Sequence, residues 1–157
     1  MIIFVSNPCT MTKKLLLGLT ATALLFVSSC KKDDSALPAD TWSVNDKKFV
    51  ATAVTASPLL GTISAVMSNN SIDVNCKSLP ASNADLTVND EPYTQDEVAV
   101  RAVLSGNIVY NSINGNGAYV SVRVADGKYS VIMNNIAAVN IDNPLDTVRI
   151  SANISEN

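Results

Sequence analysis

Histidine is absent from this chain of 157 residues. Its absence removes the commonest general base, the commonest zinc ligand and the imidazole of the familiar hydrolase triads. Basic residues are also scarce, because 11 Lys and Arg stand against 14 Asp and Glu, and no basic patch of the kind that binds nucleic acid is present. We therefore expect no enzymatic activity, no metal, no cofactor and no nucleic-acid partner.

Long apolar runs are missing except for one, Leu15 to Val27. Its 13 residues are fewer than the roughly 20 that a membrane-spanning helix needs. Lys13 and Lys14 precede the run and the small residues Ser28 and Ser29 follow it, which is the order of a secretory signal. We interpret residues 1–29 as a signal peptide, with Met11 as the expected start of translation.

Cys30 stands directly after the small residues, as in a lipobox. Its thiol is the group that would take a diacylglycerol, and its amine, freed by cleavage, can be acylated too. Several acyl chains anchor firmly, because each buried CH₂ contributes about 0.8 kcal/mol. We predict that Cys30 is the lipidation site and that the membrane is reached through this anchor.

The stretch from Ser29 to Asp34, Ser-Cys-Lys-Lys-Asp-Asp, resembles the start of mature lipoproteins of the Bacteroidota. That resemblance implies a lipid-anchored protein of the outer membrane, and the acidic residues Asp33 and Asp34 resemble the surface-export signal of that group. Two locations remain open at this point, the cell surface and the periplasmic side of the membrane.

Residues 30–40 read as the lipidated cysteine and a flexible tether, and residues 41–157 as one domain. Removal of the signal takes away Lys13 and Lys14, so nine Lys and Arg remain against 14 Asp and Glu and the net charge becomes −5. Cys76 is then the one cysteine without a lipid or signal assignment, so no intramolecular disulfide is expected.

Leucine and glutamate are few in this domain, whereas Asn, Ser, Thr, Val, Ala and Ile are abundant, which disfavours helices and suits strands joined by turns. The pattern predicts an all-β fold of nine or ten strands, an antiparallel sandwich, with a closed or partly open barrel as the alternative. The motif from Trp42 to Phe49 (Trp-x-Val-Asn-x-Lys-x-Phe) also resembles the opening of small β-rich lipoprotein domains of the same bacteria, which usually have glycine at the position of Asp46.

Three hairpins carry definite predictions of register. A loop at 46–47 sets Val44 opposite Phe49 and Trp42 opposite Ala51, and a loop at Asn69-Asn70 sets Ile63 opposite Cys76. The Asp126-Gly127 pair is the strongest turn signal, and it sets Val124, Val122 and Val120 opposite Tyr129, Val131 and Met133.

Candidate chemical groups are few. Four acids cluster in the polar loop 89–97, where we expect a solvated loop rather than a catalytic pair: Asp90, Glu91, Asp96 and Glu97. Three hard oxygen donors (Asp142, Asn143 and Asp146) lack the spacing of a calcium loop and are interpreted as turn residues. Alternation places Trp42, Phe49, Tyr129 and Cys76 in the core and leaves Tyr93 and Tyr119 exposed.

The sequence thus predicts a membrane-anchored lipoprotein that acts as a non-catalytic binding or structural accessory at the cell envelope. Two alternatives stay open. The first is a glycan-binding module that accompanies an outer-membrane transporter. The second is an inhibitor-type lipoprotein that presents a loop to a foreign hydrolase.

Overall fold

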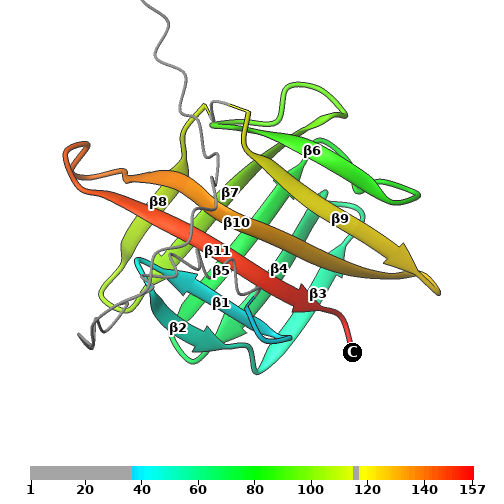
Figure 1. The fold of residues 1–157 in the computed structure, drawn as a ribbon, viewed down its shortest axis with the longest axis horizontal. Helices are drawn as coiled ribbons and strands as arrows, with labels where there is room; N and C mark the ends of the chain where they lie inside the picture. Colours follow the sequence, from blue (N-terminus) through cyan, green and yellow to red (C-terminus); the bar gives the residue numbers. More distant parts are fainter. Residues whose placement is uncertain (1–36, 115–116) are drawn as a thin grey trace, which may run out of the picture. The chain divides into compact units, whose positions relative to one another are not determined.

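A computed structural model describes residues 37–114 and 117–157, in which alternating apolar residues form strands around one core. These residues form eleven strands (Figure 1). The first five are β1 (Thr41–Val44), β2 (Lys47–Val50), β3 (Ala53–Ser57), β4 (Thr62–Met67) and β5 (Asn70–Cys76). The others are β6 (Ala84–Asn89), β7 (Glu97–Leu104), β8 (Ile108–Ser112), β9 (Tyr119–Ala125), β10 (Lys128–Asn140) and β11 (Thr147–Ser155). The all-β prediction is confirmed, and no helix long and apolar enough to cross a membrane occurs in the described ranges.

All eleven strands belong to one hydrogen-bonded sheet in the order β2-β1-β11-β10-β9-β6-β7-β5-β4-β3, with β8 between β10 and β7. The sheet is folded over itself, so that β2, β1, β11, β10 and β9 form a near layer and β3, β4, β5 and β7 lie behind it (Figure 1). The two layers enclose a single apolar core, as in a sandwich. The pairing is antiparallel except between β6 and β7, which are parallel.

A bulge in β10 makes the folding-over possible. The residues up to Met133 pair with β9, and the residues from Ala138 pair with β8, so one strand serves both neighbours. The register against β11 shifts between Met133 and Ile136, and Asn135 adopts a positive φ of 58°. The Ser151 hydroxyl accepts the Asn135 N–H at 2.9 Å and holds the bulge in place.

The strand count of nine or ten was too low by one or two. After the predicted turn at 46–47, alternation at Phe49, Ala51 and Ala53 predicts one continuous strand, but the chain leaves β2 at Val50 and begins β3 at Ala53. Between them the Ala51 N–H donates to the Asp40 carbonyl and the Thr52 N–H donates to the Val66 carbonyl. The break therefore carries the chain from the near layer to the far one.

Two of the three predicted hairpin registers were wrong by two residues. Trp42 lies opposite Phe49, and Ile63 lies opposite Val74, because the loops are Asn45-Asp46 and Ser68-Asn69. The first loop needs positive φ at both positions, which Asn and Asp tolerate better than the Lys47 of the predicted loop. A shift of two keeps every side chain on its face, so the predicted core survives the error.

The third hairpin is confirmed. Val124, Val122 and Val120 lie opposite Tyr129, Val131 and Met133, as the Asp-Gly turn predicts. Trp42 and Phe49 close the other end of the core, with ring centroids 4.1 Å apart and an interplanar angle of 14°. The Trp42 ring nitrogen is buried without a hydrogen-bond partner among the described residues.

Candidate functional site

The loop between β6 and β7, Asp90 to Asp96, is the most polar connection of the domain and projects from the upper edge of the view in Figure 1. Because β6 and β7 are parallel, the loop must lead the chain back along β6, so that the start of β7 lies beside the last residues of β6. The Thr87 N–H donates to the Asp96 carbonyl at 2.8 Å, which fixes the end of the loop against β6.

The Glu97 carboxylate organises the loop from within. Its Oε2 accepts the N–H groups of Tyr93 (2.9 Å) and Thr94 (2.8 Å). Its Oε1 accepts the Asn89 side-chain amide at 3.2 Å. The Thr94 N–H is the largest cause that lowers the pKa of Glu97 below its ordinary value, so this side chain is a charged structural acceptor.

Hydrogen bonds from the neighbouring elements hold the base of the loop. The buried Ser112 hydroxyl donates to the Asn89 carbonyl at 2.6 Å and accepts the Val100 N–H at 2.9 Å. The Lys77 ammonium donates to the Tyr93 carbonyl at 3.0 Å. The loop therefore has a defined backbone conformation, although its side chains face solvent.

Tyr93 is the principal side chain that this loop displays, with 59% of its surface exposed. The negative charges of Asp90, first, and of Glu91 raise the pKa of the Tyr93 hydroxyl. Tyr119, 58% exposed, lies directly across from Thr87, which is itself paired with Glu97. Both tyrosines predicted to be exposed are thus exposed, and Tyr119 shares a cross-strand row with the residue that organises the loop.

Two acids of the loop region accept hydrogen bonds from donors of the same region. The Glu97 carboxylate accepts two backbone N–H groups and the Asn89 amide, and Asp90 Oδ1 accepts the Glu91 N–H at 3.1 Å. The loop can offer an aromatic ring, carboxylates and backbone carbonyls to a partner. These groups suit recognition by stacking, hydrogen bonding and ion pairing.

Cys76 lies in the core as predicted, but next to Gly61 instead of Ile63. Its N–H donates to the Gly61 carbonyl at 2.8 Å, and Val98 pairs with it from β7. Burial raises the pKa of the Cys76 thiol to about 11, so the nucleophilic thiolate is disfavoured. Gly61 has a φ of 66°, and a side chain there would collide with the Cys76 carbonyl.

The loop 141–146 between β10 and β11 is held by hydrogen bonds to the Asp146 carboxylate. Asp146 Oδ2 accepts the Tyr110 hydroxyl at 2.8 Å and the Asn140 side-chain amide at 3.0 Å. The Asn140 bond, first, and the Tyr110 bond lower the pKa of Asp146. Sequence reasoning missed this contact, because 36 residues separate Tyr110 from Asp146. In the described part of the chain no three His, Cys, Asp or Glu side chains are grouped to hold a metal ion.

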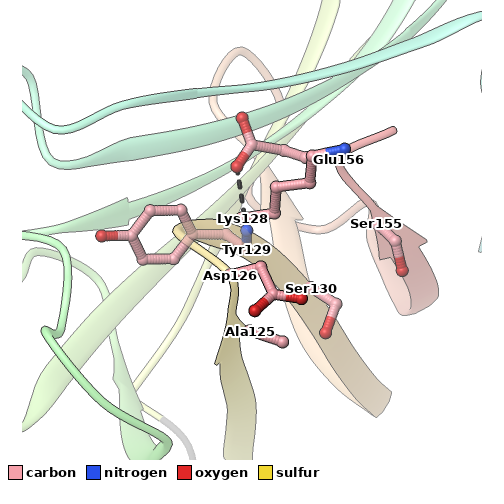
Figure 2. A pocket seen from close by; sticks show the side chains of 7 residues that line it. All are labelled: Ala125, Asp126, Lys128, Tyr129, Ser130, Ser155 and Glu156. Carbon is pink, nitrogen blue, oxygen red and sulfur yellow. Dashed lines mark hydrogen bonds between the residues drawn. The ribbon is translucent and has the colours of Figure 1, made fainter.

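A shallow hollow of about 360 Å³ lies beside the C-terminus (Figure 2). Lys128, Tyr129, Ser155 and Glu156 are among its lining residues. The Glu156 carboxylate accepts two backbone N–H groups there, that of Ala56 through Oε1 at 2.8 Å and that of Tyr129 through Oε2 at 2.9 Å. Glu156 thus joins β3 to β10, and Asp126 is the second acid of the lining.

Cys30, the predicted lipidation site, lies outside the described residues, as do the signal peptide and most of the tether. Comparisons with protein-family models, curated proteins and solved structures found no match. The functional argument therefore rests on this chain's own residues.

Proposed function

We propose that this protein is a lipid-anchored, non-catalytic accessory of the bacterial outer membrane that binds a partner through the loop between β6 and β7, Asp90 to Asp96. The observation that carries the binding role is the loop itself, because Glu97 holds its backbone while Tyr93 remains exposed. A loop that is already ordered loses little conformational entropy when it binds.

The lipid anchor is supported by the signal, the small residues and Cys30 in the order of a lipobox. Replacement of Cys30 by serine should abolish acylation and leave the precursor uncleaved by the lipoprotein peptidase. Incorporation of labelled fatty acid measures the effect, and label in the serine variant would contradict the assignment.

A protein partner is favoured over a glycan. Glycan sites commonly stack sugars on exposed aromatic faces, whereas Tyr93 lies in a loop bordered by Asp90 and Glu91 and Tyr119 lies on a strand. A projecting acidic loop with a tyrosine suits a recess with positive charge, as in an inhibitor that occupies the site of a foreign hydrolase.

The test measures inhibition of lysozymes and secreted proteases by the lipidated protein. Binding of soluble polysaccharides is measured in parallel, because they are the ligands of the glycan alternative. If Tyr93 is a hot spot, Tyr93→Ala should weaken inhibition by roughly 30-fold, which corresponds to about 2 kcal/mol. Tyr119→Ala is the matched control, because it removes an equally exposed tyrosine from a strand. Binding to a polysaccharide without inhibition would replace the protein partner by the glycan alternative.

A further inference from the structure

The described chain begins on the outer face of the near layer, which consists of β2, β1, β11, β10 and β9. The Leu37 carbonyl accepts the Asn153 side-chain amide at 2.8 Å, and Asp40 Oδ1 accepts the Ser155 N–H at 3.2 Å. Asn153 is paired with Thr41 on one side and with Ile132 on the other, and Thr41 is paired with Val50. The tether therefore joins the domain at the middle of a row that crosses this face.

This face differs in charge from the rest of the domain. The five strands of the near layer contain no Asp or Glu and five basic residues, Lys47, Lys48, Arg123, Lys128 and Arg149. Strands β3, β4, β5, β7 and β8 contain Asp73, Glu97 and Arg101. Six acids lie in β5, β6, β7 and the loop between β6 and β7, and the other six lie in the segments that flank the near-layer strands: Asp40, Asp46, Asp126, Asp142, Asp146 and Glu156.

Most of these cations point to solvent. Alternation puts Lys48, Lys128 and Arg149 on the side opposite to Phe49, Val131 and Ile150, which are buried, and all three cations are exposed. Arg123 forms an ion pair with Asp85 of β6, with 3.0 Å between nitrogen and oxygen. The described residues show no second ion pair, so Lys48, Lys128 and Arg149 keep their charge for an external anion.

Two aliphatic side chains lie in the same row as the tether. Val50 is 62% exposed and Ile132 is 49% exposed, one on each side of Thr41 and Asn153. Lysines and exposed aliphatic groups around a short acyl tether are the composition of a surface that meets lipid headgroups.

We infer that the outer face of the near layer is the membrane-facing surface of the domain and that it contacts anionic lipid headgroups. The inference rests on the lipid anchor of the proposed function. Leu37 is seven positions after Cys30, a reach of at most about 25 Å when fully extended. Attraction between surface charges acts over about 8 Å at physiological ionic strength, which is shorter than this reach, so the cations come within range of the headgroups only when this face turns toward them, and the tether allows that orientation.

A net charge of −5 by itself discourages adsorption to an anionic surface. The distribution of charge limits that effect for one orientation, because the near layer and the segments that flank its strands carry five basic residues and six acids, whereas the other described residues carry two basic residues and six acids. An anionic surface would thus repel this face least, and it would orient the domain with the exposed cations of the near-layer strands toward the headgroups.

The experiment uses the lipidated full-length protein on vesicles of phosphatidylcholine, with or without phosphatidylglycerol, that contain a headgroup-linked fluorescence quencher. A fluorophore is placed at Ile132→Cys or, as matched control, at Val66→Cys, which replaces a partly exposed aliphatic residue on β4 of the far layer. Buried Cys76 is blocked from labelling by its position in the core.

On anionic vesicles the label at position 132 should be quenched several-fold more than the label at position 66, and salt near 1 M should reduce the difference because the Debye length falls to about 3 Å. Lys48→Gln with Lys128→Gln should reduce it too, whereas Arg101→Gln, which neutralises an exposed cation on β7, should not. Equal quenching at both positions with normal acylation of Cys30 would overturn the membrane-facing surface alone. Loss of vesicle binding with an unacylated Cys30 would overturn both the surface and the proposed anchor.

Discussion

Two glutamates in this domain perform the same chemistry at different ranges. Glu156 and Glu97 each accept two backbone N–H groups through the carboxylate. The partners of Glu156 lie 100 and 27 residues away, on β3 and β10. The backbone partners of Glu97 lie four and three residues away, in one loop.

The range of the contact decides what each carboxylate stabilises. A contact that joins distant strands is lost only when the strands separate, so it contributes to the stability of the whole domain. A contact within one loop is lost when that loop alone opens. Glu156 therefore stabilises the whole fold, whereas Glu97 stabilises the conformation of the candidate binding loop.

The largest expected effect is that of Glu156→Ala. The variant leaves the Ala56 and Tyr129 N–H groups without their charged acceptor, and hydrogen bonds to charged groups contribute about 1.5–3 kcal/mol. The free energy of unfolding should fall by about this amount in denaturant titrations. Glu156→Gln retains one acceptor oxygen, so its free energy of unfolding should lie between that of Glu156→Ala and that of the parent protein. An unchanged denaturation midpoint for Glu156→Ala would contradict the distinction between Glu156 and Glu97.

Cys76 provides a reporter of global opening. It is buried and the pKa of its thiol is raised to about 11, so thiol reagents should react slowly until the domain unfolds. Glu156→Ala should accelerate this labelling, whereas Glu97→Ala should leave it unchanged. Cys76→Ala itself should cost about 1–2 kcal/mol through lost packing. Equal labelling rates for native and denatured protein would contradict the buried position.

Glu97→Ala should loosen the loop without unfolding the sheet. Amide hydrogen exchange of Tyr93 and Thr94 should become faster, because both N–H groups lose their acceptor. Exchange of core amides such as that of Val100, which donates to Ser112, serves as the internal control. Faster exchange throughout the domain would show that Glu97 stabilises more than the loop.

The smallest effect is a dependence of the loop on pH. Because the pKa of Glu97 in the folded protein is lowered from the ordinary value of 4.5, its contribution is complete above that value and is lost as the pH falls through the lower, folded pKa. The amide signals of Tyr93 and Thr94 should therefore titrate below pH 4.5 with the Glu97 carboxyl. Glu97→Gln should abolish this titration, and its persistence in the variant would assign it to another acid.

Local sequence determined those parts of the fold that depend only on one tight turn or on the alternation of apolar residues along one strand. Asp126-Gly127 specified a hairpin register that is confirmed residue by residue, and alternation identified Trp42, Phe49 and Cys76 as core residues. Two other registers were wrong by two, because Asn45 and Ser68 enter their turns earlier than the pattern indicated. Tertiary partners select between such turns: the Asn45 side chain accepts the Arg149 N–H at 2.8 Å from β11.

The sequence by itself determined the all-β class, the apolar face of each strand and the exposure of Tyr93 and Tyr119, since each depends on neighbours along one strand or within one loop. Only the tertiary structure decided the bulged β10 that serves two neighbours, the link from Glu156 to β3 and the gathering of the basic residues on one layer. These features join residues up to 100 positions apart, and their geometry depends on the folding of the sheet over itself. No short-range pattern encodes that folding, because it results from packing two layers around a common core.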